Sequence, residues 1–256
     1  MSILQPAGSA PRVWTGDGGD VDVASVRYSG AMDERFDEQE RAPARSGFAF
    51  RLFGLPVAVQ PWFFLTAYIV GRQSIDLVTE SVWILVVFVG VLVHELGHAL
   101  AARGAGLAPS ITLHGFGGTT SWAPTRPVGP WTQIGITAAG PALGITVGGL
   151  AWALLNWGAA GPAATVLRDV MWVNLGWGVL NLLPVLPLDG GQIAGALAGM
   201  VAGRNGRVAV RLLSLGLLAG IAVWGLLGGR LWTLFLAIIL GYANVEALRR
   251  ERAHPG

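Results

Sequence analysis

The chain contains no cysteine and no lysine, and it carries few charged residues of either sign. Without cysteine there is no disulfide bond and no thiolate, so a bound metal ion would need histidine and carboxylate ligands. Charged residues make up 12% of the 256 residues, whereas a soluble domain usually has roughly 25%. The net charge is only +2, with no basic stripe interleaved with aromatic residues, so we expect no nucleic-acid partner.

Hydrophobic residues make up 53% of the chain and are gathered in long runs, which points to the lipid bilayer as a partner. A helix needs roughly 20 apolar residues to cross about 30 Å of hydrocarbon, and each run is near that length, although the first is short. The predicted fold is therefore an all-α polytopic membrane protein with about six transmembrane helices. The expected spans are Pro56–Gly71, Val78–Arg103, Trp131–Trp157, Ala163–Leu186, Val208–Leu227 and Leu231–Leu248.

Residues 1–50 differ in composition from the rest of the chain. They are rich in small and charged residues and show no sustained apolar periodicity, which is typical of a disordered segment. The sequence therefore predicts a disordered cytoplasmic tail over residues 1–50 and a membrane-embedded domain over residues 51–256.

Arginine is distributed unevenly between the expected loops. With the N-terminus inside, 14 of the 17 arginines fall in inner segments and 3 in outer loops. Because basic residues gather on the cytoplasmic side of membrane proteins, we expect a multi-pass protein of the cell membrane with both termini in the cytoplasm.

The segment Ile111–Pro124, between the second and third spans, does not have a helical pattern. Its β-forming residues and the pair Gly117–Gly118 predict a short membrane-associated β-hairpin. In the third span, Gly140, Gly144 and Gly148 recur every four residues, which indicates a face for close helix packing.

The last third of the second span contains the motif His94-Glu95-Leu96-Gly97-His98, which follows a run without charge from Ser81 to Val93. Residues four apart lie on one face of a helix, so both imidazoles can reach one metal ion with Glu95 beside it. Ionisable groups are costly in lipid and should face the protein interior. The alternative is a pair of core histidines bonded to hydroxyl or backbone groups, with no metal.

A catalytic zinc ion usually has three protein ligands and an open position for water. The candidates for the third ligand are His114, Asp169, Asp189, Glu246 and His254. Asp189 stands out because it follows Pro184 and Pro187, which break the preceding helix and let unwound backbone present a carboxylate at membrane depth.

Two motifs in this order, HELGH in one span and NLLPVLPLDGG at the end of a later one, resemble the site-2 protease family of intramembrane zinc metalloproteases. The resemblance extends over about Val57–Leu248, with the Gly117–Gly118 pair and with Gly140-Pro141. Within that family, the sequence is similar to the compact six-span branch without a PDZ or CBS domain, which is the sporulation protease group. One departure is Gly144, where the family commonly has asparagine.

The resemblance implies one zinc ion per chain, with His94, His98 and Asp189 as ligands and Glu95 as the residue that activates water. It implies that Asn181, Gly117 and Gly118 help to bind the substrate or to stabilise the transition state. It also implies that the strand near Ile111–Phe116 pairs with an unwound substrate. The expected partner is a transmembrane protein, such as an anti-sigma factor or a membrane-tethered regulator, cut during regulated intramembrane proteolysis. Two alternatives stay open: a catalytically silent membrane scaffold, and a zinc-binding or zinc-transporting membrane protein.

Overall fold

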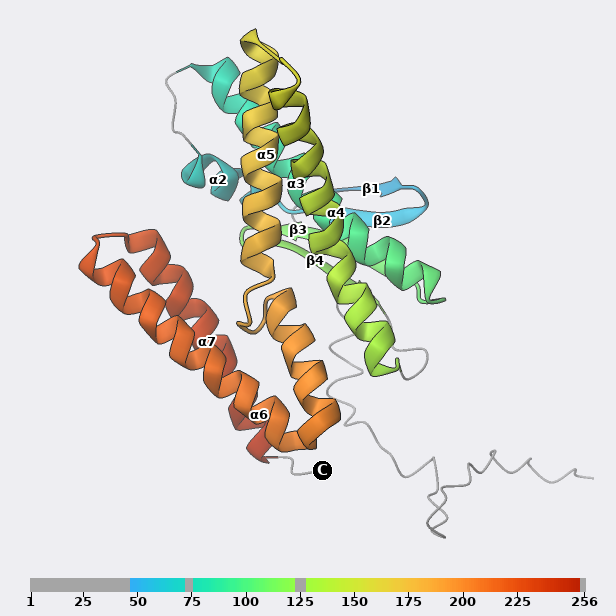
Figure 1. Ribbon diagram of the computed structural model, residues 1–256, viewed down its shortest axis with the longest axis vertical. Helices are drawn as coiled ribbons and strands as arrows, with labels where there is room; N and C mark the ends of the chain where they lie inside the picture. The colour runs from blue at the N-terminus through green and yellow to red at the C-terminus, as the bar shows by residue number, and fades with distance from the viewer. Residues whose placement is uncertain (1–46, 72–75, 123–127, 254–256) are drawn as a thin grey trace, which may run out of the picture. The chain divides into compact units, whose positions relative to one another are not determined.

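The structure is a computed structural model that describes residues 47–71, 76–122 and 128–253. Six helices, α2 to α7, and a four-stranded sheet make up this part of the chain (Figure 1). The predicted fold class is confirmed: the described chain is mainly helical, with a β-hairpin between α3 and α4. The predicted tail lies outside the described residues except at its end, because strand β1 begins at Phe48.

The predicted hairpin belongs to a larger sheet. Strands β3 (Pro109–His114) and β4 (Gly117–Trp122) are antiparallel, and β3 also pairs in parallel with β2 (Leu55–Val59), which pairs with β1 (Phe48–Leu52). The order β1-β2-β3-β4 leaves β1 and β4 as the edges. Gly117 and Gly118 open β4 and do not form the turn, which is made by Gly115 and Phe116.

The first predicted span is not one continuous helix. Its beginning is strand β2, and helix α2 covers only Pro61–Val70. Ten residues at 1.5 Å per residue give about 15 Å, roughly half of the hydrocarbon thickness. The apolar run was read as helix because alternate residues of a buried strand are also apolar; Leu55, Val57 and Val59 all face the core.

Helix α3 (Leu77–Gly104) is the long helix that carries the histidine motif. The carboxylate of Asp76 caps it by accepting hydrogen bonds from the backbone N–H groups of Val78 and Thr79, at 3.3 and 3.0 Å. The Thr79 hydroxyl also donates to Asp76, and these bonds lower the pKa of the Asp76 carboxyl. The cap therefore satisfies two N–H groups of the first turn and defines the start of the helix at Leu77.

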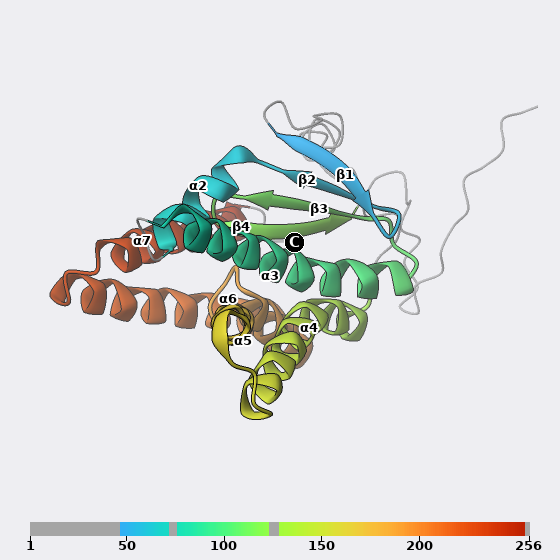
Figure 2. The same cartoon turned by 90° about the horizontal axis from the view of Figure 1, so that it is seen from above.

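Helices α4 (Pro130–Asn156) and α5 (Gly161–Asn181) pack against α3 on the side away from the sheet, as Figure 2 shows. The predicted glycine stripe of α4 lies in these contacts. A Cβ atom at Gly148 would lie 2.7 Å from Cγ of Leu175 on α5. The stripe thus lets the helix backbones approach closely, as small residues do in membrane proteins.

Helix α6 (Asp189–Leu227) is kinked, and α7 (Leu231–Ala253) packs along its second part. Ala202 and Gly203 have non-helical dihedral angles, and Gly203 has a φ of 56° that favours glycine. The chain reverses there, so that a Cβ at Gly206 would collide with the carbonyl of Ala198 (Figure 1). The predicted fifth span, Val208–Leu227, is only the second part of this helix.

By length and composition, α3, α4 and α6 can each cross a membrane. Between α3 and the sheet lies a core of buried apolar side chains, among them Val57, Val91, Ile111 and Leu113. Figure 2 shows α3 between the sheet on one side and α4 and α5 on the other. A polar group on the buried part of α3 is therefore shielded from lipid by protein on both sides.

The contact at Gly148 leads to a prediction about stability. Gly148→Ala should destabilise the protein by about 1–2 kcal/mol, because the backbone nitrogen of Leu175 lies 3.0 Å from the added methyl group and cannot move easily. Gly149→Ala is the matched control, since nothing lies within 4 Å of its Cβ position. Thermal unfolding of both variants in detergent measures the difference; equal midpoints would contradict the packing role.

Candidate metal centre

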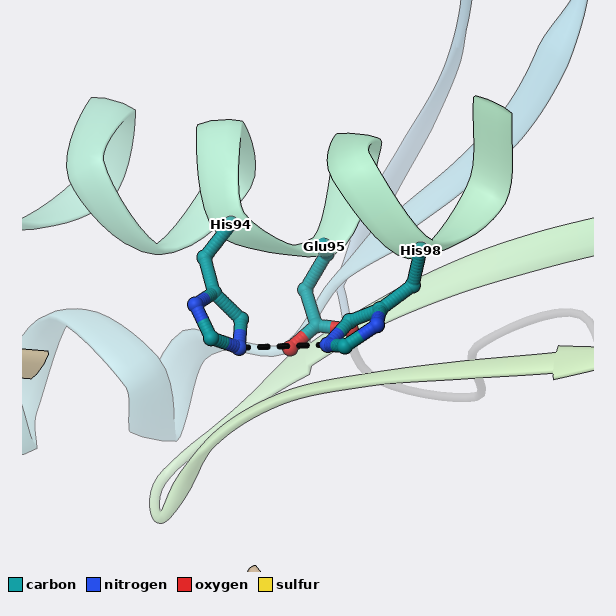
Figure 3. Close-up of side chains that lie close together, drawn as sticks. All are labelled: His94, Glu95 and His98. Carbon is teal, nitrogen blue, oxygen red and sulfur yellow. Dashed lines mark hydrogen bonds between the residues drawn. The ribbon is translucent and has the colours of Figure 1, made fainter. Parts of the chain in front are cut away.

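His94, Glu95 and His98 lie in the buried part of α3 and project from the helix toward the β3–β4 hairpin (Figure 3). Their exposed fractions are 3%, 5% and 7%. The four-residue spacing brings the two imidazoles together, with Nε2 of His94 and Nε2 of His98 3.2 Å apart. The motif therefore forms a compact polar cluster inside the fold.

Asp189, the first residue of α6, reaches the same cluster although it lies 95 residues after His94. Its Oδ2 is 3.1 Å from Nε2 of His94 and 3.4 Å from Nε2 of His98. The three atoms form a nearly equilateral triangle. Two helices that are distant in the sequence thus bring three potential ligand atoms to one point.

The size of this triangle fits a tetrahedral zinc ion. Zinc binds imidazole nitrogen at about 2.0–2.1 Å and carboxylate oxygen at about 2.0–2.2 Å, which places neighbouring ligand atoms about 3.3 Å apart. The observed separations of 3.1, 3.2 and 3.4 Å are close to this value. Three such ligands leave the fourth position of the tetrahedron open.

Hydrogen bonding determines the tautomer of His98. Its Nδ1 donates to the backbone carbonyl of Ile136 on α4 at 2.9 Å, which leaves Nε2 with its lone pair directed at the cluster. With His98 neutral and Asp189 ionised, neither His98 Nε2 nor Asp189 Oδ2 carries a hydrogen. Only Nε2 of His94 can then carry one. Three electron-rich atoms at such distances are suited to a cation, and the residues present fit zinc.

Glu95 lies beside the triangle and is held by strand β4. A carboxylate oxygen of Glu95 lies within 4.8 Å of nitrogen atoms of both imidazoles. The Thr120 hydroxyl donates to Oε2 of Glu95 at 2.7 Å, and a Cβ at Gly118 would lie 2.4 Å from Cγ of Glu95. Gly118 thus permits close approach of the strand, and Thr120 orients the carboxylate.

Glycines of the helices also make room for the cluster. A Cβ at Gly140 on α4 would lie 2.2 Å from Nε2 of His98, and one at Gly97 would lie 2.4 Å from the carbonyl oxygen of Ala139. The glycine stripe therefore contacts a candidate ligand as well as packing helices. The sequence reading gave Gly140 only a packing role and missed Thr120, because spacing along the chain contains no signal for either contact.

Two other predicted site residues, Asn181 and Gly117, make their described contacts away from the histidine–aspartate cluster. The side chain of Asn181 donates to the carbonyl of Trp177 in its own helix, at 3.0 Å, and no hydrogen bond described here joins it to the cluster. Gly117 has a φ of 125°, and its Cβ position is occupied by the ring of Trp177. Its surroundings are therefore those of a packing position.

Asp189 is the one candidate third ligand among the described residues with a hydrogen bond or ion pair to either imidazole. His114 lies on β3 and its Nε2 is 2.9 Å from the Thr119 hydroxyl, while burial lowers the pKa of its imidazole. Asp169 is buried within α5, and Glu246 lies on α7. His254 lies outside the described residues.

Strand β4 presents an unpaired edge next to Glu95. Strand β3 has neighbours on both sides, β2 and β4, so the predicted substrate pairing at Ile111–Phe116 has no free edge there. On β4 the edge away from β3 has no partner strand in the described sheet. The free strand edge beside Glu95 therefore belongs to β4 and not to β3.

Parts of the chain are similar in sequence to a known peptidase family and to curated zinc metalloproteases. The model of peptidase family M50 matches residues 156–225, which contain Asp189 but not the histidine motif. The chain is similar to the "Putative zinc metalloprotease Rip3" of Mycobacterium tuberculosis, with 39% identity over 180 residues, covering 62% of this chain and 43% of the relative. A "Putative zinc metalloprotease" of Synechocystis is 29% identical over 223 residues, covering 74% and 56%.

Among solved structures, the site-2 protease from Methanocaldococcus jannaschii has a similar fold. The TM-score is 0.56 at 21% identity, and the match covers 78% of this chain and 94% of that one. The chain spans about half the length of the curated relatives it matches. The family model and the curated relatives agree: the chain is similar to peptidase family M50 over residues 156–225 and to putative zinc metalloproteases, and its fold is similar to that of a site-2 protease.

Proposed function

We propose that the protein is a zinc endopeptidase that hydrolyses peptide bonds of membrane proteins within the bilayer, with His94, His98 and Asp189 as zinc ligands and Glu95 as general base. The observation that carries the proposal is the triangle of His94 Nε2, His98 Nε2 and Asp189 Oδ2, with the Glu95 carboxylate beside it. The relatives named as zinc metalloproteases support it.

When bound, zinc supplies a Lewis acid that polarises the substrate carbonyl and lowers the pKa of water toward about 7. Glu95 takes the proton of the attacking water and passes it to the leaving amine. The hydrogen bond from Thr120 occupies Oε2 of Glu95 and leaves Oε1 to accept that proton. Burial among α3, α4 and the sheet limits the water that reaches the site, which strengthens these electrostatic interactions.

The free edge of β4 supports binding of the substrate as an extended strand. Peptide bonds in a helix are hydrogen-bonded and covered, so a transmembrane substrate must unwind before it is cut. Unpaired backbone groups on β4 can then bond the unwound segment, as in other cases of strand addition. Gly118 and Thr120 place that strand beside Glu95, while Gly117 and Asn181 stay proposed supports for the substrate.

The substrate class is a transmembrane protein, because the site lies on a helix long and apolar enough to cross the membrane. An anti-sigma factor or another membrane-tethered regulator, cut in regulated proteolysis, is the family role that we propose. A silent scaffold would not need Glu95 in position, and a transporter would need further ligand clusters along a path. Among the described residues, the histidine motif is the one group found that could hold a metal ion.

We also propose that both termini are cytoplasmic. The excess of arginine in the expected inner segments supports this orientation. The end of α3 and the start of α6 then both face the inner half of the membrane, which agrees with their meeting at one site.

Metal analysis of the purified protein tests the ligand set. The wild type should hold about one zinc ion per chain, and Asp189→Ala should lose most of it, because two imidazoles alone bind zinc weakly. Thr146→Val is a suitable control on α4, where the Thr146 hydroxyl bonds only within its helix. Zinc content in Asp189→Ala equal to that of the wild type would exclude Asp189 as a ligand.

Replacement of the general base should separate catalysis from metal binding. Glu95→Gln should lower kcat on a model transmembrane substrate by about 10²–10⁴-fold while zinc content stays near one per chain, because the amide cannot accept the proton of water. Glu246→Gln on α7 is the matched control. Equal cleavage by Glu95→Gln and wild type would exclude Glu95 as the general base, whereas no cleavage by either protein would favour the scaffold.

The absence of cysteine makes the orientation directly measurable. Ala108→Cys, after α3, and Ala160→Cys, before α5, each introduce a single exposed thiol. With both termini inside, an impermeant maleimide should label Ala160→Cys in intact bacterial cells and Ala108→Cys only after permeabilisation. The opposite pattern would reverse the assignment.

A further inference from the structure

Residues 182–188, which connect α5 to α6, are non-helical although they lie between two long helices. Pro184 and Pro187 prevent helical hydrogen bonding through this segment. In lipid, backbone N–H and C=O groups need hydrogen-bond partners, because no water is there to replace them. The partners of this segment therefore determine where it stays, and with it the position of Asp189.

Both backbone polar groups of Leu186 are bonded to buried side chains of other helices. The Leu186 N–H donates to the hydroxyl of Ser214 on α6 at 2.9 Å. The Leu186 carbonyl accepts a hydrogen bond from the side-chain amide of Asn244 on α7. Ser214 lies 28 residues after Leu186 and Asn244 lies 58 residues after it, so these contacts exist only in the folded protein.

The two side chains are almost completely inaccessible, with exposed fractions of 0% for Ser214 and 1% for Asn244. Ser214 donates its own hydrogen to the carbonyl of Val210 at 2.9 Å, which leaves its oxygen to accept from Leu186. The amide of Asn244 has two hydrogens, and the second goes to the carbonyl of Leu240. A hydrogen bond within its own helix thus orients each side chain, Ser214 or Asn244, toward the segment 182–188.

Apolar contacts hold the same segment. Val185, next to Leu186, is 2% exposed and packs with Leu218 of α6 and Ala237 of α7. The segment is therefore seated on the pair formed by the second part of α6 and α7. The hydrogen bonds of Leu186 fix its position along that surface, which apolar contacts alone do not specify.

Leu186, whose backbone is bonded by Ser214 and Asn244, lies three positions before Asp189 and is packed against the start of α6. A Cβ at Gly191 would lie 2.4 Å from the backbone nitrogen of Leu186, and one at Gly190 would lie 2.1 Å from the carbonyl oxygen of Leu182. The segment and the first turn of α6 are thus in direct backbone contact. A shift of Leu186 moves the backbone that carries Asp189.

We propose that Ser214 and Asn244 are positioning residues of the metal centre, which hold the Leu186 backbone so that the carboxylate of Asp189 stays at the two imidazoles. The proposal rests on the proposed zinc ligation. Residues that orient metal ligands typically change metal affinity by about 10- to 100-fold when removed.

The test uses the purified full chain in detergent, with metal removed by chelation. Ser214→Ala and Asn244→Leu remove the bonds to Leu186 with little change in volume. Hydrogen exchange of a peptide that contains Leu186 should become faster in both variants without metal. Titration with Co²⁺ should then show affinity weakened by about 10- to 100-fold and weaker visible absorption bands of the tetrahedral ion.

Asn156→Leu is the matched control, because the Asn156 amide makes the same bond to a carbonyl four residues back but is exposed and remote from the loop. Its exchange and Co²⁺ affinity should match the wild type. In an Asp189→Ala background, Ser214→Ala and Asn244→Leu should cause no further loss of affinity, whereas a general loosening of the fold would weaken binding in that background too.

Unchanged Co²⁺ affinity in Ser214→Ala and Asn244→Leu, or a loss that persists in the Asp189→Ala background, would overturn the positioning role. If Asn244→Leu does not fold, Ser214→Ala decides the result by itself. Failure of the proposed function would give a different result. If the wild type binds Co²⁺ no better than Asp189→Ala, the ligand set is refuted, whatever the rate of hydrogen exchange at Leu186.

Discussion

The convergence of two imidazole nitrogens and one carboxylate oxygen within 3.1–3.4 Å is the constraint on which the rest of the structure depends. Bringing polar groups together in an apolar protein interior is costly unless they are paired or bind a cation. The protein separates this cluster from lipid by placing α3 between a sheet and a helix pair. Gly118 and Gly140 provide the space for the Glu95 and His98 side chains, and Gly97 lets the backbone of α4 approach α3.

The sheet and the helices contribute differently to the site. Helix α3 supplies three side chains at fixed spacing, and α6 supplies the fourth. Strand β4 adds Thr120, which bonds Glu95, and an unpaired edge beside it. The cleavage that we propose within the membrane needs both parts, because a general base must be oriented and an unwound peptide needs backbone partners where water is scarce.

The segment between α5 and α6 shows how irregular backbone is tolerated in such a protein. Pro184 and Pro187 free the chain from the helix, and Ser214, Asn244 and the packing of Val185 satisfy and seat it. Buried polar side chains on α6 and α7 therefore relate directly to the carboxylate that begins α6. The second half of the membrane domain is joined to the candidate metal centre through these contacts.

The sequence by itself determined the membrane-helical class and the pairing of His94 with His98, because hydrophobic length and helical spacing are local properties. Asp189 could be selected from the prolines before it. Only the tertiary structure decided that β1 and β2 extend the sheet, that α2 is short and that α6 is kinked at Gly203. The contacts of Thr120, Gly140, Ser214 and Asn244 join residues far apart in the chain, and one sequence contains no distance between them.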